Sequence, residues 1–178
     1  MKLKPTPIQG LFVVTSPNSF DARGLFVKPY NREQFQSNGL ACNFDETFYS
    51  TSKKNVLRGF HLQLPPHDSK KLVWVSNGSV LDVALDLRKE SKTYGDCFST
   101  ELSSNNFKAM YIPEGVAHAF YVLGNEATVF YQVGKCYSAI ADSGIKWDSA
   151  GFSWPCEYPT ISDRDQELPK LNVFTSPF

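Results

Sequence analysis

Short runs of β-branched and aromatic residues follow one another along most of this chain, and turn residues separate them. The clearest runs are LFVVT (11–15), LFVKPY (25–30), KLVWV (71–75), SVLDVALDL (79–87), AMYIP (109–113), HAFYVL (118–123) and TVFYQV (128–133). Turn signals such as Ser76-Asn77-Gly78 lie between them. The 14 Phe, 8 Tyr and 3 Trp favour strands, and the 11 Gly and 11 Pro supply turns. This spacing predicts an all-β chain, folded as an antiparallel sandwich or barrel.

The run over 80–87 alternates with the period of a strand. Leu81, Val83, Leu85 and Leu87 would share one face, and Asp82 and Asp86 would lie on the other. Short helices are predicted at 31–37 and 161–167. The second begins with an N-cap candidate, Ser162, three residues before Asp165. With 178 residues, no repeat and no long linker, we expect one domain over 1–178.

Composition excludes several classes of protein. The 18 basic and 18 acidic residues balance, so nothing predicts binding to nucleic acid or to a membrane surface. No apolar run approaches the roughly 20 residues of a membrane helix. The first ten residues, MKLKPTPIQG, have no apolar core of a signal peptide, so we expect a cytoplasmic protein. The four cysteines form no CxxC pair, and we expect free thiols.

The segment NVLRGFHLQLPP (55–66) places an arginine, a glycine and a histidine in a run typical of a buried strand. Read alone, His61 is equally a core histidine satisfied by a neighbour or a general base, since an imidazole titrates near neutral pH. A regular strand would put Arg58 and His61 on opposite faces. Two explanations would bring them together: Gly59 marks a bulge, or Arg58 reaches round a rim. Ten residues past His61, Lys71 opens the next run, where it would be a solvated strand end or an oxyanion partner.

Two further polar residues interrupt apolar strand faces. His118 would share a face with Phe120, and Tyr131 would share one with Val129. Each is either the wall of a concave pocket or a buried group bonded to backbone. The three histidines are scattered, with no His-x-His pair, so a catalytic metal is not favoured. Neither a GxxxxGK[ST] loop nor a GxGxxG fingerprint is present.

Several motifs, taken in order, resemble the dTDP-4-dehydrorhamnose 3,5-epimerase family of nucleotide-sugar enzymes. They are FDARGLF, KKNVLRGFHLQLPP, KKLVWVSNGSVLDVALDLRKES, TYG, LSSNN, MYIPEGVAHAFYVL, TVFYQV, GIKW and ISDRD, and they cover most of residues 10–165. The resemblance implies a cupin-type jelly roll, a homodimer, no metal and no organic cofactor. It also implies a nucleotide-diphospho-sugar substrate with a 4-keto-6-deoxy sugar, either a hexose or a heptose, used in surface-polysaccharide or O-antigen synthesis.

The resemblance also assigns roles. His61 matches the histidine that removes a proton from carbon, Asp165 matches its carboxylate partner, and Lys71 matches the lysine near the C4 keto oxygen. Tyr131 matches the tyrosine that returns a proton from the opposite face. The matches in the substrate pocket are His118, Arg58 near the diphosphate, Arg23 near the nucleotide and Tyr137, which aligns with an aromatic that stacks on the base.

Three positions depart from the family pattern, all on the nucleotide side. Lys28 stands where the family usually has a glutamate that touches thymine, and Glu46 and Phe48 replace a Gln-Asp-Asn-like run. Exchanging a carboxylate for an ammonium reverses the preferred hydrogen-bond partner, so guanine or cytosine is an alternative to thymine. The prediction is inversion of C3, C5 or both. The alternatives are a 3,4-ketoisomerase of the same fold, a metal-dependent cupin and a non-catalytic sugar-nucleotide binding module.

Overall fold

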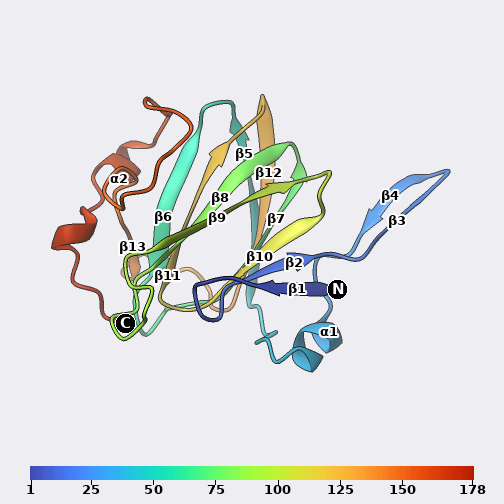
Figure 1. Cartoon of the computed structure of the whole chain (residues 1–178), viewed down its shortest axis with the longest axis horizontal. Coiled ribbons are helices and arrows are strands. Elements are labelled where there is room, and N and C mark those ends of the chain that lie inside the picture. Colours follow the sequence, from blue (N-terminus) through green and yellow to red (C-terminus); the bar gives the residue numbers. More distant parts are fainter.

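Two antiparallel sheets dominate the computed structural model, which describes residues 1–178 (Figure 1). The six-stranded sheet has the order β1 (Lys2–Pro5), β2 (Phe12–Thr15), β10 (Lys108–Ile112), β7 (Lys71–Asn77), β12 (Glu126–Val133), β5 (Glu46–Lys53). The five-stranded sheet has the order β13 (Asp142–Gly144), β6 (Leu57–Gln63), β11 (Val116–Val122), β8 (Ser79–Asp86), β9 (Cys97–Ser103). The predicted all-β fold is confirmed.

The main core lies between the two sheets and explains why the runs alternate. Inward side chains of the six-stranded sheet, such as Val73 and Val129, meet inward side chains of the other sheet, such as Ala84 and Phe120. All four are buried, and they belong to one cluster of 15 buried residues. The period of two puts every second side chain of β7, β8, β11 and β12 into this layer. Neighbouring strands in each sheet are mostly distant in sequence, as a jelly roll requires.

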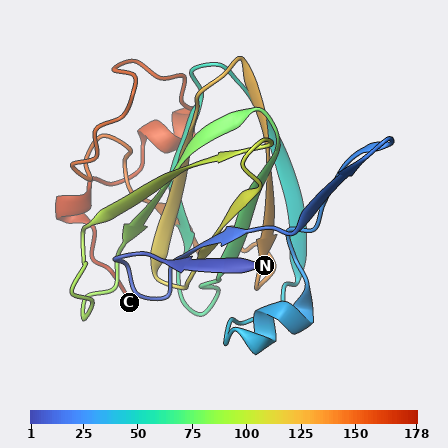
Figure 2. The ribbon, with the colours of Figure 1, turned by 45° about the vertical axis from the view of Figure 1, so that its right-hand side comes forward.

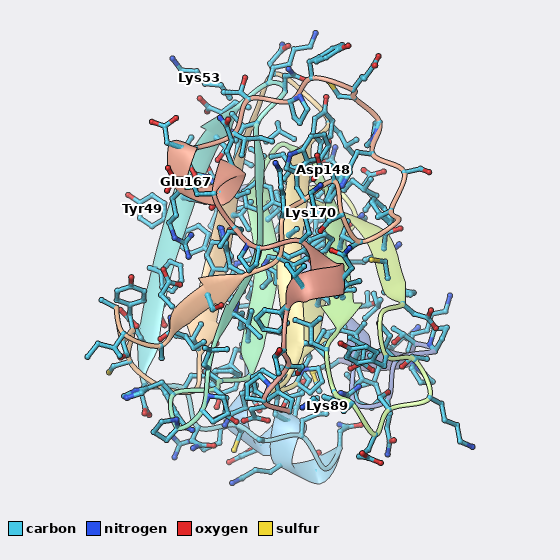
Figure 3. All side chains as sticks on the ribbon, turned by 90° about the vertical axis from the view of Figure 1, so that its left-hand side faces the viewer. Tyr49, Lys53, Lys89, Asp148, Glu167 and Lys170 are labelled. Carbon is cyan, nitrogen blue, oxygen red and sulfur yellow. The ribbon has the colours of Figure 1, made fainter.

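Additional segments cover the outer faces. The helix α1 (Arg32–Ser37) starts at Asn31, whose side chain accepts from the backbone N–H of Gln34, and it buries Phe35 against the six-stranded sheet. The C-terminal segment, with α2 (Asp163–Gln166) and the 3₁₀ turn η1 (Leu171–Val173), lies over the five-stranded sheet (Figure 3). Both predicted helices are therefore present. No helix of the structure is long and apolar enough to cross a membrane.

Strand β8 is buried on both faces. Val83, Leu85 and Leu87 pack under the C-terminal segment, whereas Asp82 and Asp86 lie on the other side with no exposure to solvent. The predicted division of faces is confirmed, and the carboxylate face is inside the protein. Buried carboxylates need partners, and those of Asp82 and Asp86 are His118 and Arg88 respectively.

A two-stranded hairpin, β3 (Asn18–Asp21) with β4 (Gly24–Val27), projects from the sandwich (Figures 1 and 2). It pairs with neither sheet. The run predicted at 25–30 is its second strand, shorter than expected because the chain leaves the ladder after Val27. Phe20 and Phe26 of this hairpin are 69% and 58% exposed, unusual for aromatic side chains.

Candidate active site

A cavity of about 420 Å³ is lined by residues of both sheets. Eight of the residues predicted for the site line it: Glu46, Phe48, Arg58, His61, Lys71, His118, Tyr131 and Tyr137. Asp165 lies behind His61 and contacts it directly. Two predicted residues, Arg23 and Lys28, are on the projecting hairpin and do not line this cavity.

A bulge in β6 brings Arg58 and His61 to the same cavity. In the pairing with β11, His61 lies opposite His118 and Arg58 lies opposite Phe120, so β6 holds one extra residue. Gly59 makes this possible with a φ of +118°. Its backbone is also in close contact with β11, since a Cβ there would lie 2.5 Å from the carbonyl oxygen of His118. The sequence left two explanations open, and the bulge is the correct one.

His61 and Asp165 form a hydrogen-bonded pair, with 2.7 Å between Nε2 and Oδ1. The short helix α2 holds the carboxylate, because the Ser162 side chain accepts from the backbone N–H of Asp165 as an N-cap. The other oxygen, Oδ2, accepts from the backbone N–H of Gly59 at 3.1 Å. A carboxylate only accepts, so it fixes the proton on Nε2 and leaves the Nδ1 lone pair free.

Opposing effects set the protonation of this pair. Burial lowers the pKa of His61, the Asp165 carboxylate raises it, and the positive charges of Arg164 and Lys71 lower it further, with a net decrease. Burial would raise the pKa of Asp165, but the bond from His61 outweighs this and the net shift is downward. At neutral pH the pair is therefore a neutral imidazole beside a carboxylate, which is the state of a base ready to accept a proton.

Lys71 lies beside the histidine at the root of β7. Its Nζ donates to the backbone carbonyl of His61 at 3.0 Å. Burial lowers the pKa of Lys71 to about 8, although the carboxylates of Asp142 and Asp82 oppose the decrease. An ammonium in such a desolvated position stabilises negative charge on a nearby oxygen more strongly than it would in water.

Tyr131 lies on β12 of the six-stranded sheet, whereas His61 lies on β6 of the five-stranded sheet. The two side chains therefore line opposite sides of the cavity. Tyr131 is 8% exposed, and its ring stacks on Phe48 with centroids 4.7 Å apart. The ring of His118 meets it edge-on, with centroids 6.0 Å apart. Burial raises the pKa of Tyr131 above its usual range, so the phenol keeps its proton at neutral pH and can donate it.

A second buried pair lies on the five-stranded sheet, beside His61. His118 Nε2 lies 2.7 Å from Oδ1 of Asp82, and both side chains are buried. Burial raises the pKa of Asp82, and His118 partly offsets the increase. Sequence reasoning missed Asp82 as a site residue. The signal was present, since a carboxylate in the run 79–87 must find a partner when both faces of the strand are covered.

A polar rim joins the mouth of the cavity to the histidine. Glu46 accepts from the backbone N–H of Tyr137 at 3.0 Å, and the Tyr137 hydroxyl donates to Asp142 at 3.2 Å. Asp142 in turn forms an ion pair of 2.6 Å with Arg164, which lies next to Asp165 in the chain. Sequence reasoning missed Asp142 and Arg164. Arg164 could have been considered from its position inside ISDRD, but nothing in the sequence singled out Asp142.

No group of three His, Cys, Asp or Glu side chains lies close enough to hold a metal ion. His67, the third histidine, is exposed and lies outside the cavity. The prediction that the protein works without a metal or cofactor stays a prediction.

The fold and the site together define a class: cupin-like jelly rolls with an acid–base pocket between their sheets. Within that class, the chain belongs to the dTDP-4-dehydrorhamnose 3,5-epimerase family, whose model matches residues 5–173. The dTDP-4-dehydrorhamnose 3,5-epimerase of Shigella flexneri is 40% identical, covering 86% of this chain and 87% of the relative. The dTDP-4-dehydrorhamnose 3-epimerase of Streptomyces niveus is 32% identical, covering 94% and 82%.

The solved structure of an epimerase also matches the fold of this chain. The dTDP-6-deoxy-D-glucose-3,5-epimerase RmlC of Legionella pneumophila, in complex with dTDP-4-keto-L-rhamnose, superposes with a TM-score of 0.93 at 31% identity. The match covers 98% of this chain and 94% of that one. The predicted cupin-type fold and the predicted class of enzyme, a nucleotide-sugar epimerase, are thus confirmed.

Proposed function

We propose that this epimerase inverts C3, C5 or both of a nucleotide-diphospho 4-keto-6-deoxy sugar by removing a proton on one face and returning one on the other. The carrying observation is the position of the two acid–base groups. The base candidate, His61, is on the five-stranded sheet with Asp165 of α2 behind it, and the acid candidate, Tyr131, is on the six-stranded sheet. A sugar ring in the cavity between them would present opposite faces to the two groups.

The chemistry follows from these positions. The 4-keto group acidifies the hydrogens on C3 and C5, and Nδ1 of His61 removes one of them. The electron pair moves to the keto oxygen, where the Lys71 ammonium stabilises the enolate in a desolvated site. Tyr131 then delivers its proton to the opposite face of the carbon, which inverts the centre. No oxidation state changes in this sequence.

The nucleotide would extend over the rim of the cavity. Arg58 offers a guanidinium for the diphosphate, and its Nε is fixed by a 3.0 Å bond to Ser52. Tyr137 is 61% exposed and offers a ring on which a base could stack. The relatives' names carry dTDP, so thymine is the first candidate. Lys28, Glu46 and Phe48 keep guanine and cytosine as candidates to be tested.

The relatives differ in whether their names give inversion at one centre or at two. The Shigella relative is a 3,5-epimerase, and the Streptomyces niveus relative is a 3-epimerase. Both groups of the catalytic pair are compatible with either outcome, since the second inversion requires the ring to reorient in the cavity. The predicted cytoplasmic location and the role in surface-polysaccharide synthesis stay predictions.

The test is to offer dTDP-, CDP- and GDP-linked 4-keto-6-deoxy sugars in deuterium oxide and to follow the products by NMR and mass spectrometry. We expect deuterium at C3, C5 or both, with inversion. His61→Asn should abolish exchange, and full exchange in that variant would refute the proposed base. Tyr131→Phe should still allow exchange but form little inverted product, whereas Tyr49→Phe, a change at an exposed tyrosine outside the cavity, should behave like the parent.

The other reactions give different results in the same assay. A shift of the keto group from C4 to C3 without inversion would indicate a 3,4-ketoisomerase. Loss of activity with a chelator, restored by iron or zinc, would indicate a metal-dependent cupin. Binding without any exchange would indicate a non-catalytic module.

We also propose a homodimer that uses the hairpin β3–β4. Its exposed aromatic residues, Phe20 and Phe26, offer an apolar surface to a second copy of the chain. Arg23 forms an ion pair with Asp21 at the turn of the hairpin, outside the cavity of its own chain. Its proposed nucleotide role, like that of Lys28, therefore requires the hairpin to reach a second copy. Sedimentation of the parent and of Phe26→Glu tests this: a monomeric parent would refute it.

A further inference from the structure

Arg164 occupies an unusual position, because it is a cation directly against the histidine that should accept a proton. Its Nη1 lies 3.0 Å from Nε2 of His61 and 3.2 Å from Oδ1 of Asp165. Its Nη2 lies 2.6 Å from Oδ2 of Asp142. The guanidinium thus spans two carboxylates that come from β13 and α2, with the imidazole beside it.

The available donors and acceptors decide whether the contact between Arg164 and the imidazole is a hydrogen bond. Nε2 carries the proton that is donated to Asp165, so it has no lone pair to accept a second bond from Arg164. The N–H of Arg164 is directed to the carboxylate oxygen that the imidazole also uses. The 3.0 Å approach between Arg164 and His61 is therefore a close approach of two donors. It is tolerable while the imidazole is neutral and unfavourable once the imidazole becomes cationic.

We propose that Arg164 is a positioning residue that keeps His61 neutral: held by Asp142 and Asp165, its guanidinium opposes protonation of the imidazole that Asp165 favours. This inference rests on the proposed role of His61 as the base. A base paired with a carboxylate alone would bind protons more readily and would be blocked on the acid side of neutrality. A fixed cation beside it restores a usable fraction of free base.

The arrangement is specific to Arg164 among the charged groups around His61. These groups are Asp165 and Arg164 from α2, Lys71 from β7, Asp142 from β13, and the His118–Asp82 pair from β11 and β8. Lys71 reaches only the backbone carbonyl of His61. Arg164 alone places a cationic nitrogen against the ring. Because arginine stays charged at all relevant pH values, its influence does not itself titrate.

Asp142 explains why the cation stays in place although the Arg164 side chain is 44% exposed. Its Oδ1 accepts from the Gln63 side chain at 3.3 Å, and its Oδ2 accepts from both Arg164 and Tyr137. Asp142 of β13 lies opposite Gln63 of β6. Its carboxylate is therefore anchored to the strand that also carries His61. A lysine could not span both carboxylates, because it lacks the planar fork of arginine.

The experiment is a proton NMR titration of the three histidines in the unliganded protein, with the His61 signals assigned by their loss in His61→Asn. In Arg164→Gln we expect His61 to titrate at higher pH than in the parent. Lys135→Gln is the matched control, since Lys135 is another cation that lines the cavity but pairs with Asp68, away from His61. It should move the titration less. Arg164→Met gives the same test if the Gln variant does not fold.

Kinetics provide the readout that a purely structural role would not move. In Arg164→Gln the acid limb of the kcat/KM profile should move to higher pH, with a roughly three- to tenfold loss on the acid side beyond any loss on the plateau. Arg164→Lys keeps the charge but loses the fork that spans both carboxylates, so its limb should lie between those of the parent and of Arg164→Gln. An unchanged or lower His61 titration in Arg164→Gln would overturn the inference. Because the NMR titration needs no turnover, it distinguishes this failure from that of the proposed function, which is tested by exchange in His61→Asn.

Discussion

His61 and Asp165 are 104 positions apart in the chain, yet Nε2 and Oδ1 lie 2.7 Å from each other. Two local features produce this contact. A Ser162 cap starts the helix that carries Asp165, and the bulge at Gly59 turns His61 toward the cavity. The backbone N–H of Gly59 also donates to Asp165, so the bulge and the helix are fixed to each other.

Replacing Asp165 by Asn should lower kcat strongly while the fold is retained. The amide removes the charge that favours the imidazolium and no longer fixes the imidazole tautomer, so we expect a loss of about 10²- to 10⁴-fold, on the scale of a general base. Steady-state rates with the preferred substrate measure this. Asp163→Asn changes an exposed carboxylate of the same helix and should have little effect. A loss below tenfold in Asp165→Asn would contradict the assigned partnership.

The sequence predicts the centre of this fold far better than its edges. The central strands β7, β8, β10, β11 and β12 correspond to recognised runs, whereas the edge strands β1, β5, β9 and β13 were missed. Edge strands such as β5, ETFYSTSK, carry polar residues because one side of the ladder has no partner strand. Their apolar pattern is therefore too weak to be read from sequence.

Only part of the site can likewise be predicted from local sequence patterns. Motifs carry the residues predicted to act as acid and base. His61, Lys71 and Tyr131 line one cavity and Asp165 contacts His61, while their roles stay predictions. Asp142 was missed because its role depends on a β13–β6 pairing between distant segments, which no local pattern encodes. The sequence offers a bulge at Gly59 as one of two explanations, and only the register with β11 selects it.

Gly59→Ala should destabilise the protein and remove activity together. A Cβ would lie 2.5 Å from the His118 carbonyl oxygen and 2.6 Å from Cα of Ala119, and the φ of +118° is unfavourable for alanine. We expect a loss of more than about 3 kcal/mol in the free energy of unfolding, measured with urea. Gly24→Ala is the matched control, because its φ is +116° but nothing lies within 4 Å. It should cost only the strain of the positive φ, about 1–3 kcal/mol. Equal losses in the two variants would show that strain, and not the contact with β11, constrains Gly59.

Asp86 should make the fold sensitive to acid. Burial alone would raise the pKa of Asp86, but bonds from Arg88, Ser91 and Thr93 outweigh it and lower the pKa to about 2 from an ordinary value of 3.8. Such a group stabilises the fold above its unfolded pKa, and this contribution is lost as pH falls from about 4 to about 2. Asp86→Asn should cost about 2 kcal/mol at neutral pH and flatten that part of the stability profile. Asp148→Asn, at an exposed carboxylate (Figure 3), should leave the profile as it is.

Lys71 should set the alkaline limit of activity. Burial lowers the pKa of Lys71 to about 8, and only the ammonium form stabilises the enolate, so kcat/KM should fall as pH rises through about 8. The raised pKa of Tyr131 places that group outside this range. Lys71→Arg keeps a cation at all pH values and should remove the alkaline limb, with a lower plateau because the geometry at the keto oxygen changes. Lys135→Arg, at a lysine of the cavity rim, should leave the limb where it is. A limb that persists unchanged in Lys71→Arg would assign it to another group and remove Lys71 from the proposed mechanism.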